Sequence, residues 1–326
     1  MNVLFILGNG FDKTQGLETS YQEFYKDYQK LKATSELEAK LKSSIRSDYE
    51  TWADLEEGLG AYSNKFSEVN TFREVINIIN YRLKDYLINK TTAIDSLGLS
   101  KAKLIKDLMY PEGELEPKQK TSFNSYLSQL TIENIKINCV TLNYTNTFEV
   151  VFGDNEAFLG IRDPEHIPVF FERLLHLHGS LDDMILVGVN DVSQIAKVAF
   201  RDDPYLIEEF VKPEINIGCE NMKNETFRHL INNADLIILF GVSVGVTDLI
   251  WWQTIGERLE NKYDTLRIIY YPYDLSKDII KHQSRKYRWS KDCIAFLKER
   301  MNVSKTVEEL RERIYVGINK PFLKLT

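Results

Sequence analysis

The stretch that decides the fold is "VLFILGNGFDKTQGLETSY", residues 3 to 21. Its apolar run, Val3 to Leu7, is too short for a helix and rich in branched side chains, which predicts a buried strand. Gly8 and Gly10 follow, and because neither carries a Cβ, the backbone can turn sharply there or approach a ligand closely. A turn of this kind after a strand often binds phosphate. We expect the first helix only after Gly16.

The rest of the chain separates into two patterns. Ser20 and Glu23 form the capping box of a helix, and apolar residues then recur at spacings of three and four to about residue 130. From residue 135, short apolar runs alternate with amphipathic stretches. We expect strands at 135–142, 173–179, 184–189, 235–245 and 266–272. We expect helices in this region and just before it at 118–130, 145–152, 204–212, 225–233, 248–262, 276–298 and 306–315.

This alternation predicts an α/β fold: a Rossmann-like, mostly parallel sheet with helices on both faces and a large helical insertion after the first strand. We assign residues 1–18 to the first strand and glycine loop of the α/β core. Residues 19–132 form the helical insertion. Residues 133–326 form the remainder of the core with its C-terminal helices.

Composition limits the classes of function. The 326 residues carry 41 basic and 48 acidic side chains, a net charge of −7, which argues against a general affinity for nucleic acid. Cys139, Cys219 and Cys293 share no spacing typical of a disulfide framework or a zinc site. No apolar run is long enough to span a membrane, and "MNVLFIL" lacks a signal-peptide leader. We therefore expect a cytoplasmic protein without membrane contact.

The first glycine loop departs from the dinucleotide fingerprint. Gly8 and Gly10 match its opening, but Lys13 stands where the third glycine belongs, which disfavours a classical dehydrogenase. Asp12 is unusual beside a phosphate site. It serves a ligand hydroxyl or a metal, or it orders the loop as an Asx turn.

A second polar segment follows the strand expected at 135–142. Asn143 and Tyr144 come directly after this strand, and the carboxyl ends of parallel strands line the ligand crevice in such folds. The Asn143 amide suits a ribose hydroxyl or a water molecule, or it belongs to a helix-start turn. Glu149, one turn into the next helix, is expected to brace a loop or lie at the surface.

Two histidines mark the third segment. His176 and His178 lie two apart, so on a strand they share a face, with His178 at the carboxyl edge before Gly179. His178 suits general acid–base work, whereas we expect His176, about 6.6 Å further down the strand, to be packed. A third ligand is not nearby, so we expect no metal.

The fourth segment is "LFGVSVGVTD", residues 239–248, again a strand followed by a glycine-rich loop and a helix. Ser243 and the loop amides could hold phosphate or ribose. Asp248 either faces the ligand or simply caps the helix.

In five segments the chain resembles the bacteriophage abortive-infection AbiH family. They are "LGNGFDKTQGLETSYQEF" (7–24), "WADLEEGL" (52–59), "VTLNYTNTFE" (140–149), "LHLHGS" (175–180) and "LFGVSVGVTDLIWW" (239–252). Their order spans essentially the whole chain. The resemblance implies a bacterial protein that limits phage spread by harming or arresting the infected host.

The chain is also distantly similar to sirtuin-like NAD-binding defence domains. This resemblance implies that Asn143 and His178 are catalytic. Asn9 and Asp12 stand where small residues or serine are expected, Thr145 replaces an acid, and the zinc cysteines are absent, which disfavours protein deacylation. The residues expected around NAD or another nucleotide are Gly8, Asn9, Gly10, Phe11, Asp12, Tyr144, Gly179, Gly241, Ser243 and Asp248.

Two functions follow as hypotheses. The first is an antiphage effector that binds, and hydrolyses, NAD or a related nucleotide in response to a phage-derived trigger. The second is a non-catalytic module that senses a nucleotide and changes its affinity for a partner, including a second copy of the chain. In that case the helices between residues 35 and 90 offer an interaction surface rather than a lid.

Overall fold

The computed structural model describes residues 1–92, 94–153, 156–164, 166–218, 222–273, 282–318 and 322–326. Cys219 and the beginning of the helix expected at 276–298 lie outside the described residues.

The described residues form a seven-stranded sheet in the order β3-β4-β2-β1-β5-β6-β7. Neighbouring strands are parallel except β3, which runs antiparallel to β4. The strands are β1 (Asn2–Leu7), β2 (Ile135–Thr141), β3 (Ala157–Arg162), β4 (Ile167–His176), β5 (Leu236–Phe240), β6 (Arg267–Tyr271) and β7 (Ile314–Val316). The expected mostly parallel α/β fold is confirmed.

The central strand is β1, the apolar run that opens the chain. Residues Val3 to Leu7 are buried, and β1 pairs with β2 on one side and β5 on the other. The chain builds the β2 side first and crosses to β5 afterwards. The strand order therefore reverses at β1, and in open α/β sheets ligands bind outside the carboxyl ends of the strands at such a point.

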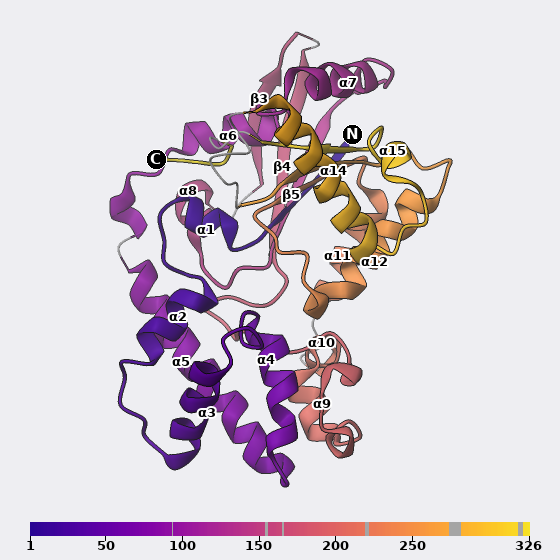
Figure 1. The fold of residues 1–326 in the computed structure, drawn as a ribbon. Coiled ribbons are helices and arrows are strands. Elements are labelled where there is room, and N and C mark those ends of the chain that lie inside the picture. Colours follow the sequence, from indigo (N-terminus) through magenta and orange to yellow (C-terminus); the bar gives the residue numbers. More distant parts are fainter. Residues whose placement is uncertain (93, 154–155, 165, 219–221, 274–281, 319–321) are drawn as a thin grey trace.

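Helices cover both faces of the sheet, and Figure 1 shows the two layers. One face packs on α6, α7 and α8, and the other on α11, α12 and α14. These helices are α6 (Lys101–Met109), α7 (Pro117–Leu127), α8 (Thr147–Phe152), α11 (Lys223–Asn233), α12 (Leu249–Glu260) and α14 (Gln283–Arg300), followed by the short α15 (Val307–Leu310).

A separate helical part lies below the sheet in Figure 1. Its helices are α2 (Tyr21–Tyr28), α3 (Glu36–Ser47), α4 (Leu55–Tyr62) and α5 (Val69–Thr91), joined by α9 (Pro204–Phe210) and α10 (Lys212–Gly218). They enclose their own aromatic-rich core, which includes Phe24, Tyr25, Trp52, Phe72 and Phe210. The capping box of Ser20 and Glu23 starts α2 as expected. The domain boundaries at 18/19 and 132/133 stay a prediction.

Some local predictions were wrong. The first helix, α1 (Gly10–Thr14), begins inside the glycine turn rather than after Gly16. Residues 184–189 make only isolated bridges, because their alternate apolar side chains pack into the helical core instead of a sheet. Strands β3 and β7 were missed, the latter because three residues at a sheet edge carry little periodicity. Within the described residues, every helix is too short or too polar to span a bilayer.

Candidate functional site

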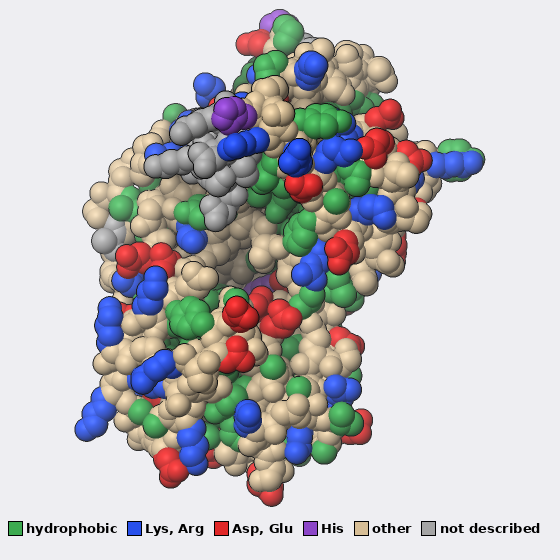
Figure 2. Space-filling view, in the orientation of Figure 1, with side chains coloured by type: hydrophobic (Ala, Val, Ile, Leu, Met, Phe, Trp, Pro, Cys, Tyr) green, Lys and Arg blue, Asp and Glu red, His purple; other side chains and the backbone are tan. Residues whose placement is uncertain are grey.

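A cavity of about 610 Å³ lies at the carboxyl edge of the sheet, facing the helical part. Figure 2 shows this face hollowed between the two parts, with a histidine visible inside and acidic side chains below it. The loops after β1, β2, β4, β5 and β6 all contribute to its wall. The expected site residues that line it are Gly8, Asn9, Gly10, Asp12, Asn143, Tyr144, His178, Gly241, Ser243 and Asp248. Their roles toward a ligand stay predictions.

Two other expected ligand contacts, Phe11 and Gly179, are not among the residues that line this cavity. The buried Phe11 ring packs at 6.2 Å from the ring of Phe148. Gly179 has a φ of +78°, and a Cβ there would lie 1.8 Å from the Met184 carbonyl oxygen. Both residues therefore pack in the structure around the site, and their expected place beside a ligand stays a prediction.

The first glycine loop uses several of its N–H groups inside the protein. The N–H groups of Gly8 and Gly10 donate to the carbonyl oxygens of Phe240 and Gly241, both at 2.9 Å, and the Phe11 N–H donates to the Gly8 oxygen. These donors are already used inside the protein. The second loop differs, because no hydrogen-bond acceptor for the N–H groups of residues 242–244 is found in the described part of the chain. Amides for an anion are therefore available among the cavity residues Val242 and Ser243 after β5 and Asn9 after β1, whose N–H also has no acceptor among the described residues.

Asn143 joins the ends of three strands. Its side-chain Nδ2 donates to the Gly8 carbonyl at 3.2 Å, after β1, and its backbone oxygen lies 3.1 Å from His176 Nδ1, at the end of β4. Its own N–H donates to Thr141 Oγ1 at the end of β2. Nδ2 carries a second hydrogen, so beyond the bond to the glycine loop the side chain keeps one donor and its oxygen acceptor.

The two histidines have different surroundings. Strand β4 ends at His176, whose ring is held by the Asn143 carbonyl and by Glu149 Oε1. Glu149 therefore braces the end of β4 through its contact with the His176 ring. His176 itself is packed against protein groups, as expected. His178 follows two residues later, is 5% exposed, and lines the cavity.

His178 begins a chain of buried ionisable groups. Its Nε2 lies 3.0 Å from Asp248 Oδ1, and the Lys212 ammonium lies 3.1 Å from the same oxygen. Lys212 Nζ also donates to Glu56 Oε2 at 2.6 Å. Asp248 precedes α12, but its side chain makes no capping hydrogen bond. Of the two roles open to Asp248 from sequence, its carboxylate therefore turns toward the site.

Burial sets the protonation of this chain. It lowers the pKa of His178, against the opposing effect of Asp248, so the imidazole is neutral near pH 7. Burial, with Asp248 and Asp54 nearby, raises the pKa of Glu56 to about 8 even though Lys212 opposes the rise. The pKa of Asp248 stays well below its usual range, because His178 and Lys212 outweigh its own burial. Asp248 is thus the fixed negative charge beside the neutral histidine.

Asp12, in the first glycine loop, is the most buried of the acidic residues that line the cavity. It is 1% exposed, and its Oδ2 accepts a hydrogen bond from Thr145 Oγ1 at 2.6 Å. Its Oδ1 is buried and has no hydrogen-bond partner among the described residues. Burial raises the pKa of Asp12, against the hydroxyl and amide groups around it.

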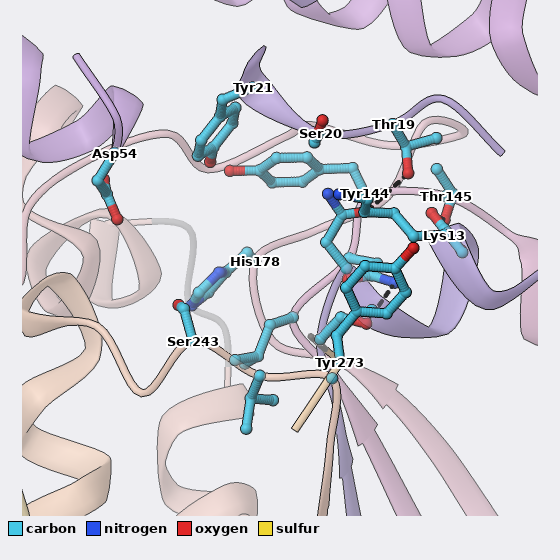
Figure 3. A pocket seen from close by; sticks show the side chains of 18 of the residues that line it. Lys13, Thr19, Ser20, Tyr21, Asp54, Tyr144, Thr145, His178, Ser243 and Tyr273 are labelled. Carbon is cyan, nitrogen blue, oxygen red and sulfur yellow. Dashed lines mark hydrogen bonds between the residues drawn. The ribbon is translucent and has the colours of Figure 1, made fainter. Parts of the chain in front are cut away.

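Tyrosine rings complete the cavity wall. Figure 3 shows Tyr21, Tyr144 and Tyr273 projecting around the space near His178, with the Asp54 carboxylate directed toward it from the helical part. The Lys13 ammonium lies 4.7 Å from the centre of the Tyr273 ring. Aromatic faces of this kind stack on planar rings. Carboxylates and aromatic rings thus lie together on a wall that also carries amide, hydroxyl and apolar side chains.

The sequence reasoning missed Asp54, Glu56 and Lys212 as site residues. Asp54 and Glu56 belong to "WADLEEGL", one of the quoted segments, so a signal was present without an assigned role. Lys212 had no signal, because its partners lie far away in the sequence: 156 residues separate it from Glu56.

Comparison with known proteins supports the resemblance seen in the motifs but not the more distant one. None of the curated proteins matches the chain. The family described as "Bacteriophage abortive infection AbiH" matches residues 4–270, which include every residue of the cavity discussed above except Tyr273. The chain therefore belongs to the bacteriophage abortive-infection AbiH family, and this membership implies a role in abortive infection by phage.

Proposed function

We propose that the chain binds NAD or a related ribonucleotide in the 610 Å³ cavity and hydrolyses its N-glycosidic bond during abortive infection. One observation carries this proposal: the neutral His178, backed by Asp248 at 3.0 Å, stands on the wall of a cavity at the switch point of the sheet. A neutral histidine held this way can accept a proton as a general base.

We infer that the proton of the neutral imidazole sits on Nε2, which lies 3.0 Å from Asp248 Oδ1 and needs only a turn of the ring to donate to it. This leaves the lone pair on Nδ1. In the reaction, water attacks the anomeric carbon of the ribose. The glycosidic carbon–nitrogen bond breaks, and its electron pair leaves with the departing nicotinamide or nucleobase. The proton lost by the water passes to His178 Nδ1. Asp248 then stabilises the imidazolium that forms.

The acidic wall fits this chemistry. Cleavage of an N-glycoside develops positive, oxocarbenium-like charge on the sugar, and fixed carboxylates stabilise such charge in a site that excludes water. Asp54 and Asp248 supply carboxylates on the cavity wall. The Asn143 side-chain oxygen and Asp12 Oδ1 are acceptors for ribose hydroxyls, and the amides of Val242 and Ser243 are donors for phosphate.

The test is an assay of the purified full chain with NAD, following nicotinamide release and, separately, binding by calorimetry, each with and without phage extract. Release of nicotinamide that is lost in His178→Gln is the expected result. Binding without turnover in every condition would instead favour the nucleotide-sensing module. The absence of both NAD binding and nicotinamide release would reject NAD as the ligand.

A further inference from the structure

The buried ionisable groups around His178 come from both parts of the molecule. Glu56 lies in the first turn of α4, in the helical part, and Lys212 begins α10. Asp248 and His178 follow β5 and β4 of the sheet. Lys212 contacts both carboxylates, at 2.6 Å from Glu56 Oε2 and 3.1 Å from Asp248 Oδ1. Its side chain is 7% exposed, so the contacts are made away from bulk water.

We propose that Lys212 is a positioning residue of this site, which holds the Asp248 carboxylate against the His178 imidazole and ties both to helix α4 through Glu56. This role rests on the function proposed for His178. Lys212 does not line the main cavity, so it acts through Asp248 rather than on a ligand. The contact requires α4 to be seated on the sheet, which couples the helical part to the proton acceptor.

The shared oxygen has an electrostatic consequence. His178 Nε2 and Lys212 Nζ both lie against Asp248 Oδ1, so the two nitrogens are within about 6 Å of each other, where charges interact strongly in a buried site. The ammonium therefore opposes protonation of His178 and keeps the imidazole a base. Asp248 favours protonation, while Lys223 opposes it as Lys212 does.

Removing Lys212 alone would leave two buried carboxylates without a cation, which is strongly destabilising. The matched pair of variants is therefore Glu56→Gln and Glu56→Gln/Lys212→Met, which differ only in the ammonium. Both replacements are close in shape to the native side chains. The double variant removes Glu56 together with Lys212, and the buried Asp248 carboxylate then keeps His178 at 3.0 Å as its partner.

The experiment measures the pKa of His178 by NMR in the full chain with labelled histidine and without ligand. The chain has five histidines, and the His178 signal is the one lost in His178→Gln. We expect the pKa of His178 to be higher in the double variant than in Glu56→Gln by about one unit or more. The signal of His176, which contacts Glu149 instead, should stay unchanged.

An equal pKa of His178 in the two variants would overturn the proposal. Should the double variant not fold, Glu56→Gln/Lys212→Gln replaces it, since the amide can still donate to Asp248, and the same rise is expected. The measurement uses no nucleotide, so it separates the two proposals. NAD hydrolysis with an unmoved pKa rejects only the role of Lys212, whereas a moved pKa without hydrolysis rejects only the NAD reaction.

Discussion

Gly10 and Gly241 touch backbone to backbone. A Cβ on Gly10 would lie 2.4 Å from Gly241 Cα, and a Cβ on Gly241 would lie 2.5 Å from Gly10 Cα. The Gly10 N–H also donates to the Gly241 oxygen at 2.9 Å. The glycines after β1 and β5 therefore let the two loops pack together, so a larger side chain at Gly10 would disturb the fold.

The first prediction concerns this contact. Gly10→Ala should lower the free energy of unfolding by about 1–3 kcal/mol, because the new methyl group must push the Gly241 backbone away. Urea unfolding followed by circular dichroism measures the change. Gly245→Ala is the control, since a Cβ there meets only ordinary contacts, the nearest at 3.5 Å. Equal stability of Gly10→Ala and the native chain would show that the loops have room to spare.

The second prediction separates the two histidines. His178→Gln should reduce nicotinamide release by about 10²–10⁴-fold with NAD binding largely kept, because it removes the proton acceptor. His176→Gln should chiefly reduce stability, because it disturbs the contacts with Glu149 and the Asn143 carbonyl. Turnover assays and thermal unfolding of both variants test this. Loss of turnover in His176→Gln alone would contradict the assignment.

The third prediction concerns pH. Burial lowers the pKa of His178 from 6.5, and only the neutral imidazole accepts a proton. Activity should therefore persist through pH 6.5 and fall on the acid side, below that value. The measurement is the pH profile of kcat/KM for NAD. An acid limb with its midpoint above 6.5 would mean that the Asp248 charge outweighs burial at this site.

The fourth prediction concerns the buried Asp12 oxygen that lacks a partner among the described residues. If Oδ1 accepts a ribose hydroxyl, a ligand lacking that hydroxyl should bind about ten- to a hundredfold more weakly, because the buried acceptor stays unpaired. Calorimetry with NAD and its deoxyribose analogues measures the loss. Asp12→Ala should remove the discrimination, while Thr145→Val, which alters only the Oδ2 side, should keep most of it.

The same discrimination in Asp12→Ala as in the native chain would place the hydroxyl elsewhere. Asn143 is then the next acceptor to test, since it lines the same cavity.

Local chemistry was enough to predict much of the fold from the sequence. The run from Val3 to Leu7 is apolar throughout because β1 is buried between β2 and β5. A short run of this kind is enough to predict a buried strand from the sequence. The box of Ser20 and Glu23 starts α2 by hydrogen bonds within four residues. The rule that ligands bind at the carboxyl ends of parallel strands then predicted that Asn143, His178 and Ser243 lie close together, and the three residues line one cavity.

Only the tertiary structure decided what those residues touch. The N–H groups of Gly8 and Gly10 are used by Phe240 at the end of β5 and by Gly241 just after it, and Asp248 faces His178 instead of capping its helix. Lys212 reaches Glu56 across 156 residues of sequence. Periodicity and capping depend on neighbours a few residues apart, whereas the partner of a buried charge depends on which elements the fold brings together, and no local pattern records that.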